Sequence, residues 1–440
     1  MKAKLRVLLL VAEPWRCDDS GGNTIDNFFN GMEGIEFAQV YCSDPMPVNK
    51  TCKRYFQIPE QEVIHGFLKH KKVGHELLLS DIDKHLIQER ETKFSNLKSG
   101  KISKFMRWVK NIRPEFLIFL RMFIWRYCNW RTQELDKFIL DFNPDVIYAP
   151  CYAFPFQLSL TRHVKELTGL KIISWSADDN YSLRQLSFSP FYWLNRFWNR
   201  HCLRETYPCY DEFYSISEDE IEELSPIVGQ QMKVLRKGVH VPETFTPRDV
   251  HTPIKFIYAG GLYCNRFKSL IKVANALRKA NEDGVKAELH IYTGSKMEGR
   301  NESSLNDSRS SFVHGLVTSE QLSKLYQESD VAIHCESFDL KYRLMTRLSF
   351  STKIIDCFQS GCAILAIASS EHTGLKYLQK EDAAFCVSDV NDIEPIIKRI
   401  VDNPELVKEY AQKAYECECK NHRIEDVQKM LYDAFVRCSN

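Results

Sequence analysis

Apolar residues in this chain cluster in short runs that alternate with stretches of helical periodicity. The first run, RVLLLVA at 6–12, predicts a buried β-strand, because both faces of a central parallel strand are covered. A Ser-Gly-Gly loop at 20–22 and a helix from Thr24 to Met32 are expected next. The order strand, Gly-rich loop and helix is typical of the start of a Rossmann-like domain.

The same pattern continues and then starts again. Further strands are predicted in the first half at 36–43, 142–150, 171–176 and 211–218, with a mostly helical stretch at 83–140. A second unit begins with the strand IKFIYAGG at 254–261, and strands are expected at 287–294, 311–317 and 330–336. Ser217 and Ser319 are expected to cap helices. The Pro-rich stretch at 241–253 is the best boundary between the two halves.

Length and composition agree with two soluble α/β domains. A chain of 440 residues exceeds one ordinary core, and 44% apolar with 27% charged residues is typical of a globular protein. A net charge of +1 gives no case for nucleic-acid binding. The odd, scattered set of 15 cysteines favours reduced thiols in a cytoplasmic protein over disulfides or zinc. The apolar N-terminus is expected to be the first strand and not a signal peptide, and no apolar run has transmembrane length.

The stretch from His334 to Ile367 carries the most chemical information. A helix starting near Thr352 would direct its first amides and the side chain of Lys353 to one place, which suits a phosphate. Asp356 lies one turn further on, at a reach that suits a ribose diol.

This stretch resembles the nucleotide-sugar signature of GT-B glycosyltransferases of the group 1, family 4 type. There an acid five positions before an (A/S)-(S/G)-G turn holds the ribose, as Asp356 stands before Gly361. The resemblance implies two Rossmann-like domains facing across a cleft. We expect an N-terminal acceptor domain at 1–240 with a helical insertion at 83–140, and a donor domain at 241–420. The final helix, 421–440, would cross back to the first domain.

The resemblance also implies a binding site for the donor diphosphate. This site would consist of a glycine loop together with hydroxyl and cationic side chains, namely Gly260, Gly261, Arg266, Lys268, Ser351, Thr352 and Lys353. Cations and backbone amides hold such a group without metal, so we expect neither a metal nor a cofactor.

The chain departs from the family pattern in the donor half. The usual motif is Glu, seven residues, Glu, whereas Glu336 lies twenty residues before Asp356, with the insertion LKYRLMTRL between them. Glu336 remains a candidate for contact with the donor sugar. Arg343 and Arg347 in the insertion either reach phosphate or face water.

A second departure lies in the acceptor half. Gly21 and Gly22 resemble the acceptor-side glycine loop, but the family's His after the strand at 171–176 is absent. Asp178 and Asp179 stand there instead, at a strand end where α/β sites form. The pair either binds the acceptor and accepts its proton, or caps the next turn.

The basic and aromatic segment 98–131 is the other local anomaly. Six cations between Lys98 and Arg113 precede a run rich in Phe and Leu, in which Trp125 and Trp130 could enter a membrane interface. The segment is either a surface for anionic lipid or a buried helix pair with solvated cations.

The resemblance and these residues together predict a glycosyltransferase. It would move a sugar from a nucleotide diphosphate to a glycan or lipid-linked acceptor in surface-polysaccharide synthesis. It would retain configuration and need no metal, in the cytoplasm or peripherally on the inner face of the membrane. The alternative is an inactive GT-B module that binds nucleotide or glycan as a partner subunit. A Rossmann-type NAD enzyme is disfavoured, because no G-x-G-x-x-G follows the first strand.

Overall fold

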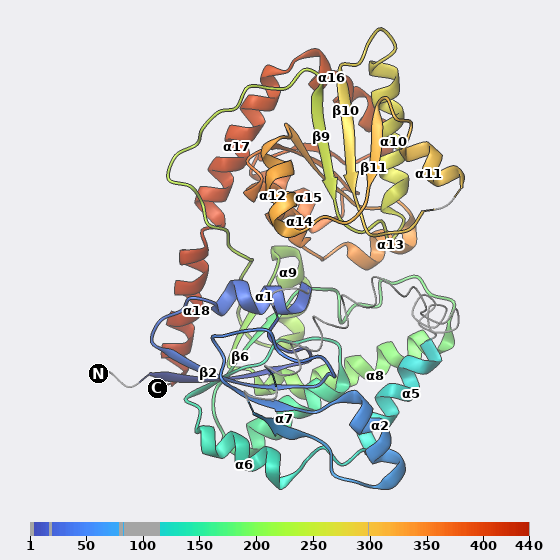
Figure 1. Cartoon of the computed structure of the whole chain (residues 1–440). Helices are drawn as coiled ribbons and strands as arrows, with labels where there is room; N and C mark the ends of the chain where they lie inside the picture. Colours follow the sequence, from blue (N-terminus) through green and yellow to red (C-terminus); the bar gives the residue numbers. More distant parts are fainter. Residues whose placement is uncertain (1–3, 17–19, 79–81, 83–114, 298, 440) are drawn as a thin grey trace.

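A computed structural model describes residues 4–16, 20–78, 82, 115–297 and 299–439 of the chain. Two α/β domains stand one above the other in Figure 1, each built on its own sheet. The two α/β domains predicted from the sequence are confirmed.

The first sheet has eight strands in the order β4-β3-β2-β1-β5-β6-β7-β8. Seven of them are parallel, and only β4 pairs antiparallel, with β3. The strands are β1 (Leu5–Val11), β2 (Ile35–Tyr41), β3 (Arg54–Gln57), β4 (His75–Leu77), β5 (Val146–Tyr148), β6 (Ile172–Ser176), β7 (Glu212–Ser215) and β8 (Met232–Val234).

The second sheet has six parallel strands in the order β11-β10-β9-β12-β13-β14. Its strands are β9 (Ile254–Ala259), β10 (Ala287–Tyr292), β11 (Ser311–His314), β12 (Val331–Cys335), β13 (Ala363–Ile367) and β14 (Phe385–Val387). Every residue of β12 and β13 is buried, because helices cover both faces of the sheet.

Helices cover both sheets. Those before the second sheet are α1 (Ser20–Phe29), α2 (Glu60–Lys69), α5 (Glu115–Tyr127), α6 (Gln133–Phe142), α7 (Pro155–Thr168), α8 (Pro190–Thr206) and α9 (Glu218–Val228). The others are α10 (Arg266–Ala280), α11 (Arg300–Leu305), α12 (Ser319–Gln327), α13 (Leu340–Thr346), α14 (Thr352–Gln359), α15 (Thr373–Lys380), α16 (Ile393–Asp402), α17 (Glu405–Asn421) and α18 (Ile424–Ser439). Short 3-10 helices lie at Tyr207–Cys209 and Val390–Asp392.

The chain crosses between the domains at two adjacent places. The segment after β8 meets the start of α18, where Val239 and Arg423 form a parallel bridge. Gly238 is required there, since a Cβ would collide with the backbone of Ile424. Helix α18 then packs on α1 and on β1, β5 and β6 of the first domain (Figure 1).

Two helix starts differ from the sequence-based expectation. Helix α1 begins at Ser20 and includes the two glycines that were expected to form a loop. The first turn of a helix has no intrahelical acceptors for its amides, so glycine is tolerated there. Helix α12 is capped by Thr318 and not by Ser319, because Thr318 and Gln321 form a reciprocal capping box. Ser217 caps α9 as predicted, accepting a hydrogen bond from the Glu220 amide.

Two further findings concern the part of the chain that the structure describes. All cysteines there are free thiols. None of the helices there combines the length and the apolar character needed to cross a membrane.

Candidate functional site

A cavity of about 680 Å³ lies between the two domains. Side chains of both domains line it, among them five of the residues singled out in the sequence: Asp178, Arg266, Glu336, Ser351 and Thr352. It lies outside the carboxyl ends of β1, β6 and β12, where ligands bind in open α/β sheets.

Lys353 reaches this region from the first turn of α14. Its ammonium donates a hydrogen bond to the Tyr258 hydroxyl at 3.0 Å and lies 4.9 Å from the Tyr258 ring centroid. Gly260, at φ 148°, makes room for it, because a Cβ there would collide with the Lys353 side chain. Burial and the neighbouring Arg266 lower the pKa of Lys353.

Arg266 is held in place by Glu336. Its Nε and Nη2 donate to the two Glu336 carboxylate oxygens at 2.9 and 2.7 Å, and both side chains are buried. The guanidinium lies 4.4 Å from the Tyr263 ring centroid, and the Lys353 ammonium lies 5.9 Å from the same ring. Burial opposes the charge of Arg266, yet the Glu336 carboxylate keeps its pKa raised. The buried Nη1 has no protein partner, so one donor remains for a ligand.

The start of α14 completes the cationic end of the cavity. Ser351 is the N-cap, and its hydroxyl accepts a hydrogen bond from the Lys353 amide. The positive end of the helix dipole therefore faces the cavity next to Lys353 and Arg266. The Lys353 ammonium, the unpartnered Nη1 of Arg266 and a helix N-terminus make this end suited to an anion.

Asp178 faces the same cavity from the first domain. Its carboxylate accepts a hydrogen bond from the Ser349 hydroxyl at 2.6 Å, across the domain boundary. Enclosure in the cleft raises the pKa of Asp178, and the charge of Asp179 adds to the effect. The group is placed to accept a proton or a hydrogen bond from a molecule in the cleft.

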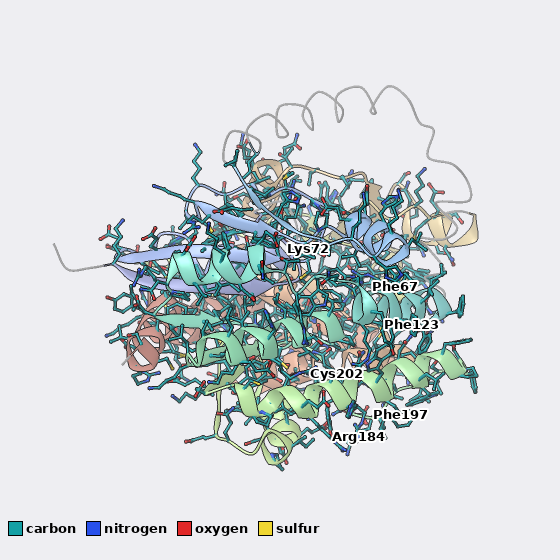
Figure 2. The ribbon with its side chains drawn as sticks, turned by 90° about the horizontal axis from the view of Figure 1, so that it is seen from below. Phe67, Lys72, Phe123, Arg184, Phe197 and Cys202 are labelled. Atoms are coloured by element: carbon teal, nitrogen blue, oxygen red, sulfur yellow. The ribbon has the colours of Figure 1, made fainter. Side chains whose placement is uncertain are left out.

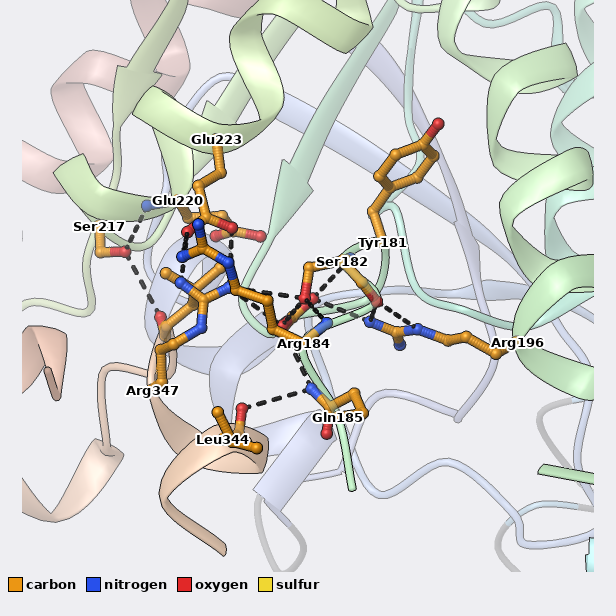
Figure 3. A network of polar contacts seen from close by, with 12 residues as sticks. Tyr181, Ser182, Arg184, Gln185, Arg196, Ser217, Glu220, Glu223, Leu344 and Arg347 are labelled. Carbon is orange, nitrogen blue, oxygen red and sulfur yellow. Dashed lines mark hydrogen bonds and ion pairs between the residues drawn. The ribbon is translucent and has the colours of Figure 1, made fainter. Parts of the chain in front are cut away.

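Asp179 does not line this cavity and belongs to a buried network, in which Ser182, Arg196 and Arg347 are labelled in Figure 3. It accepts hydrogen bonds from Ser182 and forms ion pairs with Arg196 at 2.8 Å and Arg347 at 3.3 Å. Burial alone would raise its pKa, but the Ser182 hydrogen bonds and the two guanidinium groups lower it. Asp179 thus anchors the loop that presents Asp178.

Arg347 links the network to the second domain. It lies just beyond α13, in the insertion of the family motif, and pairs with both carboxylate oxygens of Glu223 on α9. Gln185 also donates to the Leu344 carbonyl at 3.3 Å (Figure 3). The expectation that Arg347 faces water was wrong, because its side chain is buried between carboxylates. Its contact with a phosphate stays a prediction. Arg343 does lie near the surface and pairs with Glu371.

Asp356 lines a neighbouring cavity of about 640 Å³ that also includes Asn23 and His240. Burial raises the pKa of Asp356, while Lys237 and Lys353 lower it. The predicted ribose residue is therefore on the same helix as Lys353 but opens to a different part of the cleft.

The remaining predicted residues lie near the cleft or outside it. Gly21 and Gly22 are in the first turn of α1, and Gly22 packs so closely on the Arg16 backbone that a Cβ would not fit. Gly261 presents its carbonyl to the Tyr258 hydroxyl at 2.8 Å. Lys268 pairs with Asp339 at 2.7 Å and is half exposed, away from the cavity.

Three buried groups of the kind that bind metals lie close together. Ligand atoms of His334, Glu336 and His372 are all within 4.8 Å of one another. Both Glu336 oxygens are already bound by Arg266, and Lys353 is near, so the local charge disfavours a cation. That charge lowers the pKa of His334, after the larger effect of burial. The absence of a metal from the reaction stays a prediction.

Sequence reasoning missed two parts of this site. Tyr258, which orients Lys353, lies at the end of a buried strand and gave no signal of its own. Glu220, three residues after the cap Ser217, is buried and accepts hydrogen bonds from Ser176 and Ser215. Its place directly behind the Asp178 loop could be found only from the fold.

Comparison with known proteins supports the class of fold. Sucrose-phosphate synthase from Thermosynechococcus elongatus superposes with a TM-score of 0.60 at 12% identity, over 99% of this chain and 98% of that one. The lipopolysaccharide outer core galactosyltransferase WaaB gives 0.56 at 13% identity, over 98% and 100%. TarM gives 0.50 at 13% identity, over 68% of this chain, which spans little more than half (57%) of TarM.

Neither a scan of protein-family models nor a search of curated proteins gave a match. The structural likeness therefore shows only the fold of the chain, which is the GT-B fold.

Proposed function

We propose that this protein is a glycosyltransferase that uses a nucleotide-diphosphate sugar as donor. The observation that carries the proposal is that Arg266 and the N-terminus of α14 line the interdomain cavity of a GT-B chain, with the Lys353 ammonium 5.9 Å from the ring of Tyr263, another lining residue. A structural neighbour, a mutant of TarM, was solved in complex with UDP. This likeness supports a nucleotide diphosphate as the anion.

The donor would be held mainly by the second domain. Lys353, the free Nη1 of Arg266 and the amides of Ser351 and Thr352 would bind the diphosphate, with Gly260 and Gly261 allowing close approach. Asp356 would bind the ribose, and Glu336 would orient Arg266 and contact the sugar. Lys268 has a surface partner in Asp339, so its proposed role at the diphosphate is the least supported.

The reaction would break the bond between the anomeric carbon and the diphosphate oxygen and form one to an acceptor hydroxyl oxygen. The cations would stabilise negative charge as it develops on the leaving nucleotide diphosphate. The proton of the acceptor hydroxyl would pass to Asp178 or to the leaving phosphate. Asp179 would keep the Asp178 loop in position. By resemblance, the configuration is retained and no metal takes part.

The acceptor would be a glycan or lipid-linked sugar of a surface polysaccharide, which places the protein in the cytoplasm, at or near the membrane. This finer proposal rests on the family resemblance and on the basic segment 98–131, of which residues 98–114 lie outside the described part of the structure.

Donor turnover in the presence of EDTA tests the proposal. Purified protein incubated with a panel of UDP-, GDP-, ADP- and TDP-sugars should release one nucleotide diphosphate faster than buffer does. Asp178→Asn should lower the rate about 100-fold or more, within the usual range for an acid or base group. Loss of turnover in EDTA with recovery in Mg²⁺ or Mn²⁺ would refute metal independence. Binding of a donor without turnover under any condition would favour the inactive binding module.

A further inference from the structure

One face of the first domain exposes large apolar side chains on two neighbouring helices. We call it the aromatic face. It is formed by Phe116, Leu117, Leu120, Phe123 and Tyr127 of α5 and by Phe188, Phe191, Leu194 and Phe197 at the start of α8 and just before it. Phe188 is 95% exposed, which leaves nearly the whole ring in water. Contiguous apolar patches of this kind mark interaction sites.

Ring contacts connect the two helices of this face. Phe116 and Phe191 join α5 to α8 with ring centroids 5.3 Å apart. Phe123 contacts Phe67 of α2 at 6.3 Å and Tyr127 at 4.6 Å. Figure 2, seen from below, shows Phe67 and Phe123 close together, with Phe197 and Arg184 further along on the side of α8.

Two tryptophans that were expected to enter a membrane interface are not part of this surface. Trp125 is 2% exposed and stacks on Phe156 at 4.5 Å. Trp130 is 4% exposed and lies edge-on to His163. Trp125 points inward because it lies on the opposite side of α5 from Phe123 and Tyr127, and Trp130 is buried beyond the end of that helix, so both belong to the core.

The charges around the aromatic face are mainly positive. On α8, Arg196 is buried and paired with Asp179, Arg200 and Arg204 lie over the Tyr181 ring, and the acid Glu205 pairs with Arg162. Helix α5 carries two arginines and one acid, Glu115. Arg126 and Arg131 are exposed beside Tyr127. Arg121 is paired with Glu60, so that pair is neutral. A second copy of this chain placed face to face would bring like charges together, which disfavours a symmetric dimer through this surface.

We infer that the aromatic face binds the surface of an anionic lipid bilayer. Exposed Phe and Leu rings enter the headgroup region, and the arginines at the border meet lipid phosphates. No described helix is suited to span a membrane, so the attachment is peripheral. The loop from Asp178 to Ser189 connects the cleft to this face, which would bring the proposed acceptor side to the bilayer.

Co-sedimentation with vesicles tests the inference, with equal parts phosphatidylglycerol and phosphatidylcholine against phosphatidylcholine alone. The wild type should bind the anionic vesicles at least tenfold more tightly, and raised salt should weaken binding. The triple variant Phe188→Ser, Leu194→Ser, Phe197→Ser should bind at least tenfold more weakly. A control with three exposed apolar residues elsewhere, Leu140→Ser, Val285→Ser and Leu316→Ser, should bind as the wild type does.

Three results would overturn the inference. The wild type could ignore anionic vesicles at low salt, the triple variant could bind like the wild type, or both triple variants could lose binding equally. A triple variant that becomes monomeric where the wild type is dimeric, without vesicle binding by either, would assign the face to a second copy. Nucleotide binding by each variant is measured in parallel, because it reports on the proposed donor site and not on this face.

Discussion

At the scale of single residues, neighbouring side chains with the same chemistry have different surroundings. Asp178 and Asp179 are adjacent acids, yet the first faces the cleft and the second lies in a network of arginines. The sequence shows that two carboxylates follow β6, but alternation along the chain and contacts from Arg196 and Arg347 decide which one is accessible. Sequence reasoning therefore identified the place and left the roles open.

Glu220 gives a prediction at the same scale. Burial raises its pKa to about 8, so the folded protein keeps this proton up to that pH, whereas the unfolded chain loses it near 4.5. Between these values the folded state binds more protons, and its stability falls as the pH rises. Glu220→Gln removes this dependence, and its amide can still bond both serines, accepting from one hydroxyl and donating to the other. From pH 5 to pH 8 the variant should gain on the order of a few kcal/mol in free energy of unfolding relative to the wild type.

Urea unfolding at several pH values checks this. The matched change is Glu222→Gln, at an exposed position of the same helix. Its free energy of unfolding should change with pH in parallel with that of the wild type. If Glu220→Gln also runs parallel to the wild type, the Glu220 carboxyl is not protonated in the folded state.

At the scale of elements, the insertion carrying α13 connects the domains. Arg347, which directly follows α13, is 7% exposed and binds Glu223 and Asp179 of the first domain. Arg343, within α13, pairs with Glu371 near the surface. The sequence showed the insertion as a departure from the family pattern. Its partners lie more than a hundred residues away, so no local pattern could reveal them.

The two arginines allow a matched comparison. Arg347→Ala removes hydrogen bonds between charged groups and leaves a carboxylate without one partner, so it should lower the free energy of unfolding by about 1.5–3 kcal/mol. Arg343→Ala removes a solvent-exposed pair and should lower it by less than about 1 kcal/mol. Denaturant unfolding of the two variants measures the difference. Equal losses would show that the insertion does not connect the domains in solution.

At the scale of the whole molecule, the sequence predicted the fold well because each half repeats a local pattern of strand, glycine turn and helix. The start of α14 behind Ser351 was likewise readable, because a hydroxyl residue before a helical pattern is a local signal. The contacts between the domains could not be predicted from the sequence. Ser349 meets Asp178, and Gly238 lets the chain pass Ile424, and both contacts join segments that are distant in the chain.

The most direct test of the central claim, an anion site for a nucleotide diphosphate in the cleft, is calorimetric titration with UDP, GDP, ADP and TDP. The wild type should bind at least one of them, and Lys353→Met should weaken that binding roughly ten- to hundredfold, the loss of a charge-assisted hydrogen bond of about 1.5–3 kcal/mol. Lys272→Met, at an exposed position on α10, should bind as the wild type does. Equal affinity of Lys353→Met and the wild type, or no binding of any of the four by the folded wild type, would contradict the account.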